Sequence, residues 1–499
     1  MSTTTAIVGQ TVDVIVVGGG GAGLAASISA AAANRSVLLL EKEPKLGGTT
    51  GLSVGSITAS ATALQRRAGI VDSPAQHFED MALFAGELAV RDNLELRRLY
   101  TENVPDTVAW LENLGVVFFG PMPEPPHRVP RMHNVLPSSK AYIHQLWKEA
   151  RRLGVKALLN ARAQKLITTG GRVTGVEAVV NGRIVQLNAT CAVVLASGDF
   201  SSGRELKQKY LAEDIRDIDG INPASTGDGQ RLALEVGGDI VNGDIVFGPE
   251  IRFVVPPVNK LVECIPPSTQ LARIMRRSLT LVPSAILRPL LMMFITTNLA
   301  PSPSLLQKGA ILVNKLGKRF VNELDKPVYA IPRQPEQMAY IVFDNKVAAT
   351  FTGWPNFIST APGLAYAYLA DYKRNRRDIY FQADSIRALA HAFGVPVDAL
   401  AQTIAEHNRS PAGQAAPLAT PPFYALGPAK SWIAIADGGL KVNANLQVLD
   451  RSGQCIPGLF AAGSTGQGGL LLEGHGHHLG WALTSGRIAG RNAARATET

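Results

Sequence analysis

The sequence predicts an α/β fold in which a Rossmann-like dinucleotide-binding domain carries an inserted substrate or cap domain. Three observations predict it: a glycine turn between a strand and a helix near the N-terminus, the same pattern near the C-terminus, and a long segment between them without a nucleotide signature. The nucleotide-binding domain is expected over residues 1–250, the inserted domain over 251–427, and the return to the nucleotide fold over 428–499.

The N-terminal unit begins with an apolar strand over 12–17, which leads into Gly18, Gly20 and Gly23 at the start of an alanine-rich helix. These glycines have the GxGxxG spacing: the first permits a tight turn, the second lets the backbone approach a pyrophosphate, and the third lets helix and strand pack closely. The helix N-terminus adds partial positive charge for the phosphates. The next strand ends on Glu41, which is placed to accept hydrogen bonds from a ribose. This part is predicted to hold a dinucleotide.

The composition describes a globular protein with room for two domains, since the 499 residues are 46% hydrophobic and 18% charged. Three widely spaced cysteines without a CxxC exclude zinc ribbons and attached c-type haem, and no metal is expected. The net charge of +9 comes without a basic helix interleaved with aromatic residues, so nucleic acid is not expected as a partner. No secretory signal is recognised at the start, and a cytoplasmic location is expected.

The C-terminal segment over 456–490 repeats the strand–glycine–helix pattern. A helix starting near Leu479 would aim its N-terminal N–H groups at a flat anionic acceptor, such as the N1–C2=O edge of a reduced flavin. Together with DVIVVGGGGAGLAA, EKEPKLGGTTG, VVLASGDFSS, TGDG, GKRFVNE and DGGLKVN, the pattern resembles the superfamily of FAD-dependent fumarate reductases and 3-ketosteroid dehydrogenases, closer to the latter branch. The resemblance implies FAD and chemistry across a carbon–carbon bond beside a carbonyl.

The resemblance also implies a set of FAD-contacting residues drawn from both ends of the chain. These are Gly18, Gly20, Gly21, Ala22, Gly23, Glu41, Lys42, Gly48, Thr49, Thr50, Gly51, Ala196, Gly198, Asp228, Gly463, Ser464, Gly480, Trp481 and Ala482. An alternative role for Asp228 is to cap the helix that follows it. Quinol-linked relatives attach FAD covalently through a histidine just after the glycine pair, where this chain has Thr49 and Thr50, so non-covalent FAD is expected.

The substrate is inferred from departures from the family pattern. Dicarboxylate-reducing relatives place one arginine about four residues beyond the NE of GKRFVNE and another in HGxNRLGG, where it grips a carboxylate. Here no arginine follows that NE before Arg333, and the second motif is HGHHLG. Two buried carboxylates would be poorly paired in such a site, which is costly. The sequence therefore favours a ketone over a dicarboxylate.

Ketosteroid dehydrogenases carry a tyrosine shortly after the same NE, and Tyr329 follows Glu323 at a spacing two residues longer than usual. A phenolate can remove the α-proton of a polarised ketone while the β-carbon gives hydride to flavin N5. Gly476 retains the glycine whose N–H holds the ketone oxygen in those relatives. The remaining candidates are donors to the developing enolate: His475, His477 and His478, with Tyr142 and His133 less favoured.

The leading hypothesis is an FAD-dependent enzyme that dehydrogenates, or in reverse reduces, the C–C bond beside the carbonyl of a lipophilic cyclic ketone such as a 3-ketosteroid. One alternative is a fumarate-reductase-like enoate reductase acting on a carboxylate such as fumarate or an aryl acrylate. The other is a flavin-binding electron-transfer protein without chemistry of its own. An unidentified electron acceptor or donor is expected, and the oligomeric state stays open.

The segment over 271–300 is apolar and basic, and no Asp or Glu occurs between Cys264 and Asn322. Its prolines and Arg288 leave it too short to span a membrane, but an amphipathic basic helix pair could rest on anionic lipid. The alternative is an ordinary cap-domain core or dimer contact. A peripheral membrane contact through 271–300, on the cytoplasmic face, is therefore a hypothesis.

Overall fold

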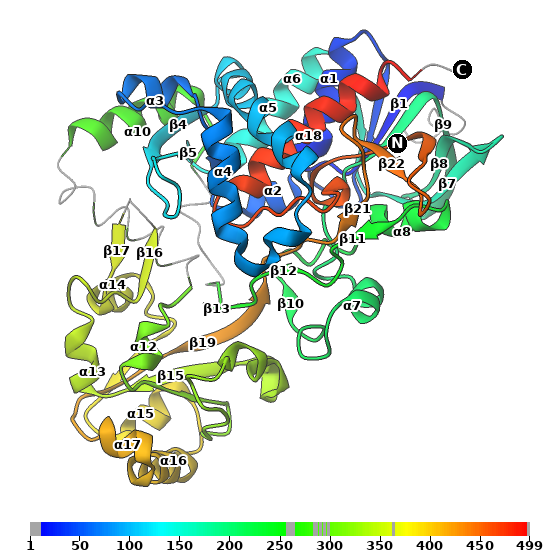
Figure 1. The fold of residues 1–499 in the computed structure, drawn as a ribbon. Helices are drawn as coiled ribbons and strands as arrows, with labels where there is room; N and C mark the ends of the chain where they lie inside the picture. Colours follow the sequence, from blue (N-terminus) through cyan, green and yellow to red (C-terminus); the bar gives the residue numbers. More distant parts are fainter. Residues whose placement is uncertain are drawn as a thin grey trace.

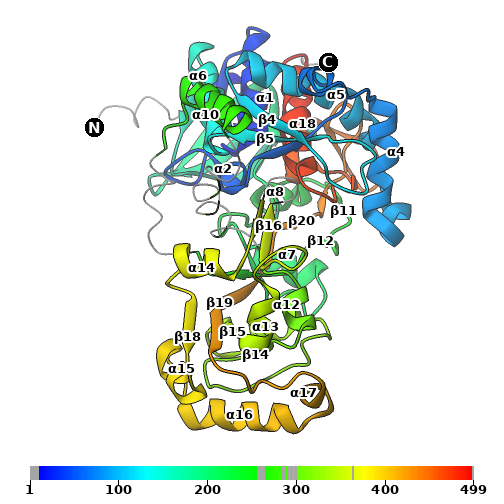
Figure 2. The ribbon, with the colours of Figure 1, turned by 90° about the vertical axis from the view of Figure 1, so that its left-hand side faces the viewer.

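The computed structural model describes residues 11–255, 265–282, 288, 292, 296, 300–361 and 365–496. Within these residues the chain forms two bodies, each built round a β-sheet, and the long strand β19 (Phe423–Ile433) extends from one towards the other (Figures 1 and 2). Helices and strands alternate along the chain, so the predicted α/β class is confirmed. The predicted boundaries at 251 and 427 stay predictions; β19 crosses the second of them.

The first sheet has the order β22-β23-β9-β1-β2-β6, with β1 between β9 and β2 in parallel register. Its strands are β1 (Thr11–Val17), β2 (Val37–Leu40), β6 (Lys156–Leu158), β9 (Arg183–Leu195), β22 (Gln447–Leu449) and β23 (Cys455–Ala461), with the hairpin β7 (Ala161–Thr169) and β8 (Arg172–Val180) pairing on β9. The inner strands are continuous apolar runs because both faces are covered. The pairing of β23 with β9 joins the two ends of the sequence in one sheet.

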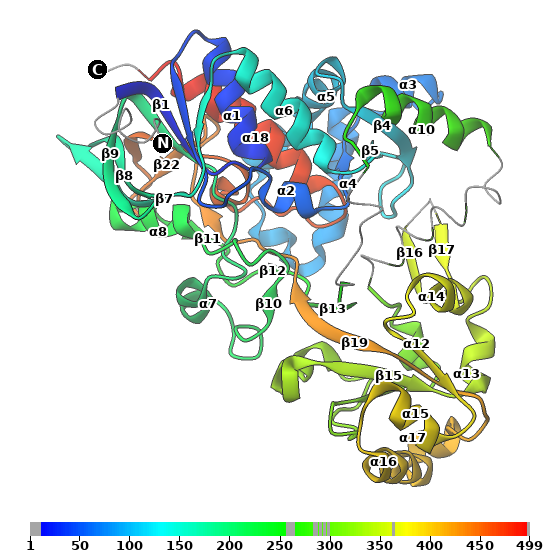
Figure 3. The same ribbon diagram turned by 180° about the vertical axis from the view of Figure 1, so that it is seen from behind.

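Helices α1 (Gly21–Ala32) and α18 (His477–Ala493) pack against each other beside this sheet (Figures 1 and 3). A Cβ added at Gly486 would lie 2.3 Å from the carbonyl oxygen of Ala22, and one at Gly490 would lie 2.2 Å from that of Ala26. These contacts advance in the same direction along both helices, so the helices run parallel. At the rise of an α-helix, the N-terminus of α18 reaches about 12 Å beyond that of α1.

Helix α18 begins at His477, with Gly476 as its cap residue, instead of near Leu479 as the sequence suggested. Gly476 has φ of +88°, and a Cβ there would lie 2.7 Å from the backbone nitrogen of Thr58. Glycine therefore lets the chain turn closely against its neighbour and start the helix early. As a result His477 and His478 belong to the first turn of α18.

A third, smaller layer covers the other side of α18. It consists of the antiparallel strands β3 (Ser56–Thr58), β5 (Met132–Leu136) and β4 (Val117–Met122), with the helices α4 (Pro74–Ala85), α5 (Leu94–Asn113), α6 (Lys140–Arg152) and α10 (Thr269–Leu281). Ser73 and Asn93 cap α4 and α5 through their side chains, which accept hydrogen bonds from backbone N–H groups three residues on. The loop between β4 and β5 approaches the start of α18.

The second body contains the other large sheet, in the order β10-β19-β15-β14, with β13 and β18 also paired to β19. Its strands are β10 (Asp219–Gly220), β13 (Glu250–Phe253), β14 (Ile311–Val313), β15 (Ala339–Phe343) and β18 (Tyr380–Ala383), and helices α13 (Asn345–Thr350), α15 (Ile386–Phe393), α16 (Val397–Arg409) and α17 (Pro411–Ala415) accompany it. It has hydrophobic clusters of its own.

Short elements complete the described chain. They are the helices α2 (Gly48–Leu52), α3 (Ala63–Arg67), α7 (Arg204–Tyr210), α8 (Asp228–Glu235), α12 (Ser304–Gln307) and α14 (Leu369–Asn375), the 3₁₀ turns over Gly86–Arg91, Pro327–Tyr329, Ile331–Arg333, Pro335–Gln337 and Gly463–Gly466, and the two-stranded pairs β11 (Ile240–Val241) with β21 (Gly439–Leu440), β12 (Val246–Phe247) with β20 (Ile435–Ala436), and β16 (Ser359–Ala361) with β17 (Ala365–Ala367).

Helix α10 covers part of the hypothetical membrane segment. Its Ala272, Met275 and Leu279 pack in a cluster with Val117 and Leu136 of the small sheet, while Ile274 and Leu281 are exposed. Arg288 pairs with Asp371 at 2.7 Å. Most of 283–299 lies outside the described residues, and within those residues no helix is both long and apolar enough to cross a membrane. The membrane contact and the cytoplasmic location stay predictions.

Candidate functional site

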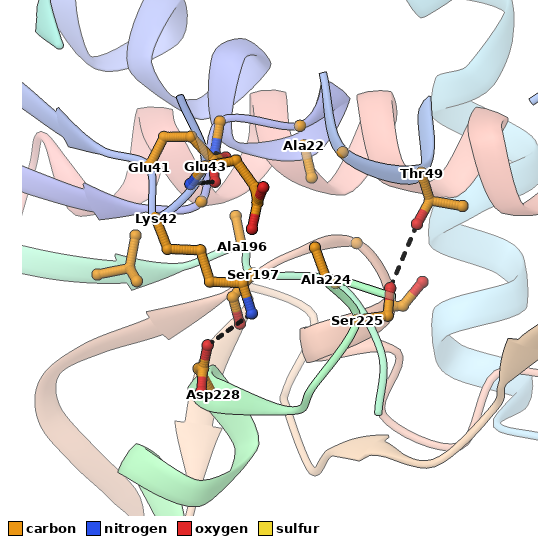
Figure 4. A pocket seen from close by; sticks show the side chains of 18 of the residues that line it. Ala22, Glu41, Lys42, Glu43, Thr49, Ala196, Ser197, Ala224, Ser225 and Asp228 are labelled. Atoms are coloured by element: carbon orange, nitrogen blue, oxygen red, sulfur yellow. Dashed lines mark hydrogen bonds and ion pairs between the residues drawn. The ribbon is translucent and has the colours of Figure 1, made fainter. Parts of the chain in front are cut away.

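A cavity of about 850 Å³, counting its open mouth, lies where β1, β2 and β9 end (Figure 4). Fifteen of the nineteen residues predicted to contact the cofactor line it: Gly18, Gly20, Gly21, Ala22, Glu41, Lys42, Gly48, Thr49, Thr50, Ala196, Gly198, Asp228, Gly463, Ser464 and Ala482. The two ends of the sequence thus meet in one pocket at the carboxyl edge of a parallel sheet, where nucleotide-binding folds place their ligand.

The glycine turn has the geometry that its spacing predicts. Gly18 has φ of +110°, and a Cβ there would lie 2.4 Å from the carbonyl oxygen of Ala196. A Cβ on Gly23 would lie 1.8 Å from the carbonyl oxygen of Gly18. Around Gly20, in contrast, the nearest atom to an added Cβ is 3.9 Å away. The turn is therefore closed on its protein side and open where a ligand can approach.

Glu41 is buried at the end of β2 and ties the glycine turn to the strand. Its Oε2 accepts a hydrogen bond from the backbone N–H of Gly19 at 2.8 Å, and its Oε1 accepts one from Glu43 at 2.9 Å. Burial raises the pKa of this carboxyl, while the two backbone N–H groups work in the opposite direction. Each oxygen keeps a second acceptor position, so the structure leaves room for the predicted bond to a ribose.

Asp228 is the charged centre of the pocket wall. Its carboxylate accepts hydrogen bonds from Lys42 Nζ at 2.9 Å (Figure 4) and from Arg162 at 2.9 Å, and Arg231 lies 3.2 Å away. Burial acts to raise the pKa of Asp228, but the hydrogen bonds from Lys42 and Arg162 outweigh it and the pKa is lowered. The alternative that Asp228 caps its helix is wrong, because the cap residue of α8 is Gly227 and the helix has no side-chain cap.

Hydroxyl groups line the part of the pocket that follows the second glycine pair. Thr50 Oγ1 accepts a hydrogen bond from Gly21 N–H at 3.1 Å, which fixes α2 against the start of α1. Thr49 Oγ1 lies 3.4 Å from Ser225 Oγ (Figure 4) and accepts a hydrogen bond from Asn222 at 2.9 Å. Ser225 and Asn222 belong to a loop that carries no sequence motif, so motif spacing did not find them.

Four predicted contact residues do not line the cavity. Gly23 packs against the carbonyl of Gly18 behind the cavity wall, and the nearest atom to a Cβ added at Gly51 is Ile143 Cγ1 at 3.8 Å. A Cβ on Gly480 would meet the hydroxyl of Tyr100 at 2.3 Å, and the buried Trp481 donates its ring N–H to the carbonyl of Gly463 at 3.1 Å. Gly480 lets α18 pack closely against Tyr100, and Trp481 holds the C-terminal glycine turn.

The three histidines at the start of α18 point to three different partners. His475 is half-exposed; its Nδ1 lies 2.5 Å from Glu124 Oε1, which also accepts a hydrogen bond from the His475 backbone. The hydrogen bond to Glu124 raises the pKa of His475. His478 Nε2 lies 2.9 Å from the fully buried Asp437, whose Oδ1 also accepts a hydrogen bond from Gln467. The ring of Phe247 stands 5.6 Å from that of His478.

His477 is buried, and its Nδ1 lies 2.5 Å from the carbonyl oxygen of Glu473. Burial lowers the pKa of His477 to about 3, so the ring is neutral. Tyr142 and His133 are also buried, and they bond Gly55 and Thr62 respectively, at 2.8 Å each. Tyr142 is a satisfied core residue, whereas Nδ1 of the buried His133 has no hydrogen-bond partner among the described residues.

Tyr329 lies at the end of a 3₁₀ turn in the second body and is partly buried. It packs at the edge of a cluster that contains Phe200, Leu206 and Ile433, and burial raises its pKa. No hydrogen bond or ring contact joins it to the α18 histidines among the described residues. The structure therefore brings the histidines and the pocket into one body but does not bring Tyr329 into contact with them.

Comparison with known families assigns the chain. A family model described as the FAD binding domain matches residues 13–255 and 289–471. The chain belongs to this family. The protein is therefore an FAD-dependent flavoprotein, and the predicted cofactor is confirmed as FAD. Its non-covalent attachment, and the contact residues one by one, stay predictions.

The curated relatives of this flavoprotein are reductases. It is 29% identical to a probable fumarate reductase of Shewanella frigidimarina, over 92% of this chain and 71% of that protein. It is 27% identical to the NADH:fumarate oxidoreductase of Klebsiella pneumoniae and 25% identical to the NADH:acrylate oxidoreductase of Vibrio harveyi, over 92% and 97% of this chain. The flavoprotein spans only 45% and 50% of those two relatives.

Solved structures agree with this placement. The open conformation of a flavocytochrome c3 fumarate reductase superposes with a TM-score of 0.74 at 26% identity, covering 99% of this chain and 79% of that chain. A 3-ketosteroid Δ4-(5α)-dehydrogenase from Rhodococcus jostii RHA1 superposes with a TM-score of 0.61 at 25% identity, covering 99% of both chains. The predicted superfamily is confirmed, and with it an FAD-dependent oxidoreductase acting on a carbon–carbon bond. The ketosteroid specificity is not confirmed, because these curated relatives are fumarate and acrylate reductases.

The pocket of the flavoprotein fits FAD. Gly20 leaves open space beside the first turn of α1, where backbone N–H groups and the helix dipole attract a pyrophosphate. Glu41 stands at the end of β2 for the ribose. The parallel start of α18, about 12 Å farther on, suits the flavin end of the same molecule. Of the residues at the start of α18, Ala482 lines the cavity, whereas none of residues 475–481 does.

Proposed function

We propose that the protein reduces the C=C bond of an enoate that carries one carboxylate, such as an aryl acrylate. The observation that carries the proposal is the His478–Asp437 pair in the first turn of α18. The names of the relatives, which include fumarate and acrylate reductases, support the same class of reaction. This is the enoate alternative raised by the sequence, now preferred to the cyclic ketone.

The pair has the arrangement of an acid–base group. Asp437 is fully buried, and its Oδ1 holds His478 Nε2 at 2.9 Å while Gln467 holds the carboxylate from the other side. The other ring nitrogen, Nδ1, has no hydrogen-bond partner among the described residues. A carboxylate fixes the orientation of an imidazole, as in catalytic triads. His478 is therefore the proposed proton donor, and Asp437 is the residue that positions it.

The proposed reaction balances with one hydride and one proton. When bound in its reduced form, FAD supplies a hydride to the β-carbon of a conjugated alkene. His478 donates a proton to the α-carbon, so the double bond becomes a single bond and the carboxylate is unchanged. The N-terminal N–H groups of α18 would hold that carboxylate, because a helix N-terminus attracts an anion. Phe247, beside His478, offers a ring surface for an aryl group.

A single carboxylate also suits the charges at this position. The two arginines of the dicarboxylate-reducing pattern are absent: no arginine follows the NE of GKRFVNE before Arg333, and histidines stand in the second motif. A helix N-terminus and one imidazole can hold one carboxylate, whereas two would leave a buried charge without a partner. Fumarate is accordingly expected to be a weaker substrate than an acrylate with an aryl or alkyl group at the other end.

Anaerobic flavin reoxidation tests the proposal. The purified holoprotein is reduced with dithionite and mixed with cinnamate, fumarate, cyclohexenone or a 3-ketosteroid, and the return of the flavin absorption is followed. Cinnamate is expected to reoxidise the flavin fastest. Reoxidation by the enone or steroid but by neither carboxylate would refute enoate reduction.

The cyclic-ketone hypothesis remains a second candidate because of the superposition on the Rhodococcus jostii dehydrogenase. It assigns proton abstraction to Tyr329, which packs with Phe200 and Leu206. In Tyr329→Phe it requires a loss of at least about 100-fold in turnover of a cyclic ketone. Enoate reduction, which uses His478, predicts that the same variant keeps its activity towards cinnamate.

A further inference from the structure

Three buried histidines from three separate parts of the chain meet behind the start of α18. His77 comes from α4, His127 from the loop between β4 and β5, and His477 from the first residue of α18. One ring nitrogen of each lies within 4.8 Å of a ring nitrogen of both others. Their residues are 0%, 8% and 0% exposed. Histidine is less often fully buried than aliphatic residues, so three buried histidines in one cluster need a physical explanation.

The spacing of the closest two nitrogens fits a tetrahedral cation. His77 Nε2 and His477 Nε2 are 3.3 Å apart. Two nitrogens bound to zinc at about 2.05 Å, with a tetrahedral angle between them, stand about 3.3 Å apart. A hydrogen bond explains the same distance only if one nitrogen carries a proton. In that case another nitrogen is left without a partner.

The hydrogen bonds of the cluster leave ring nitrogens unused. His477 Nδ1–H donates to the carbonyl of Glu473, which leaves a lone pair on Nε2. If His77 Nε2–H donates to that lone pair, His77 Nδ1 has no partner, as is the case in the structure. His127 Nε2 is likewise buried without a partner. Buried polar atoms without partners are costly, and a bound cation would give His127 Nε2 a partner.

The surroundings resemble those of metal-binding histidines. A histidine that ligates a metal donates its other N–H to a carbonyl or a carboxylate; Glu473 provides this for His477. For His127, Nδ1 lies 3.9 Å from Asp80 Oδ2 and 2.9 Å from Arg131 Nη1. Ligation through Nε2 requires a proton on Nδ1. Asp80 must then replace Arg131 as the hydrogen-bond partner of that nitrogen. Arg131 also pairs with Asp72 at 2.7 Å, so it keeps a carboxylate partner after that shift.

We propose that His77, His127 and His477 bind one divalent cation of the zinc class. Three neutral imidazoles are the ligands of many zinc sites, with a fourth position taken by water. The rings of Phe84 and Tyr100 lie against these histidines and would exclude further water. The cation would join α4, the β4–β5 loop and the start of α18, and so fix the first turn in which His478 lies. The inference does not depend on enoate reduction being the activity.

Metal uptake by the full-length FAD-loaded protein tests the site. The protein is dialysed against a chelator, titrated with Zn²⁺ or Co²⁺ alone, and its metal content is measured by mass spectrometry. We expect saturation at one cation per chain and, with Co²⁺, ligand-field bands of tetrahedral intensity at wavelengths longer than the flavin absorption. Absence of saturable uptake by the unaltered protein would overturn the proposal, whatever the variants do.

Two ligand variants locate the cation. His77→Gln and His127→Gln should each weaken binding by roughly 100-fold or more, because each removes one of three ligands. His391→Gln, on the exposed surface of α15, is the matched control and should bind as the unaltered protein does. The flavin spectrum of each variant reports that it is folded. Unchanged uptake by both folded ligand variants would place the cation elsewhere and refute this site.

Discussion

Helices α1 and α18 each have a glycine as the N-cap residue, run parallel and contact each other through small residues. Their N-termini nevertheless have different surroundings. The start of α1 is open beside Gly20 and is fixed by Thr50, and the nearest carboxylate, Glu41, accepts a hydrogen bond from Gly19 N–H. The start of α18 is surrounded by histidines that contact Glu124, Asp437 and one another. One terminus offers fixed dipoles, and the other offers groups that can gain or lose a proton.

The difference suits a division of work along one cofactor. Phosphates need a constant positive potential, which backbone N–H groups supply at any pH. Reduction of an alkene needs a proton at a defined atom, which only a titratable side chain supplies. The offset of about 12 Å between the two helix starts separates these tasks in space. Substitutions at each terminus should therefore affect different measurements.

The largest effect on FAD binding is expected at the start of α1. In Gly18→Ala the new methyl group would lie 2.4 Å from the carbonyl oxygen of Ala196, at φ of +110°. Backbone must shift, at a cost of about 3 kcal/mol or more, so FAD affinity should fall by at least about 100-fold. FAD content after gel filtration measures this.

Gly171→Ala is the matched control for that substitution. Gly171 has φ of +81° but nothing within 4 Å of an added Cβ. It carries a similar backbone strain without the clash, so the variant should keep its FAD. Equal loss of FAD in both variants would show that strain alone, and not the closed side of the turn, is responsible.

At the start of α18, His478→Gln should keep FAD and lose activity. Removal of a proton donor lowers kcat by about 10²–10⁴-fold, while KM changes little because the carboxylate is held by backbone. Asp437→Asn should lower kcat by a smaller factor, since the imidazole stays but is no longer oriented by a charge. Stopped-flow reoxidation with cinnamate measures both. An unaltered kcat in His478→Gln would remove the proposed donor.

These two regions also differ in how far the sequence predicts them. The glycines and Glu41 follow from local spacing, because the two strands and the helix of this unit are adjacent in the sequence. The partners of the histidines do not: Glu124 and Asp437 are separated from them by 351 and 41 residues. No periodicity links such positions, so the sequence indicated histidines near a flavin without indicating which one has a carboxylate to orient it.

The start of α18 was also misplaced by two residues for a local reason. The sequence suggested a helix from about Leu479. The contact of Gly476 with the strand that contains Thr58 fixes the cap earlier. Tertiary packing thus sets the helix start. Tyr329 was selected by its resemblance to the tyrosine of ketosteroid dehydrogenases, and the structure packs it against Phe200 and Leu206.

A moderate effect is expected on stability when Asp228 loses its charge. Asp228→Asn removes the partner of Lys42 and Arg162 and should destabilise the protein by about 1–3 kcal/mol. Because the pKa of Asp228 is lowered from 3.8, its contribution is present above pH 3.8 and is lost as the pH falls through its value in the folded protein. Denaturant unfolding of both forms measures this. Asp398→Asn, in the exposed pair with Arg387, is the control and should change little.

The smallest effect is expected at the His475–Glu124 pair, and it should appear only in the pH dependence. Glu124 raises the pKa of His475 above 6.5, so the pair's contribution is fully present below pH 6.5 and is lost as the pH rises through the value in the folded protein. Solvent around the half-exposed ring screens the charges, which limits the contribution to about 0.5 kcal/mol. Glu124→Gln should remove this slope from a plot of melting temperature against pH while the FAD content stays constant. If the slope persists in the variant, another titratable group causes it. The start of α18 would then be as insensitive to pH in this range as the start of α1.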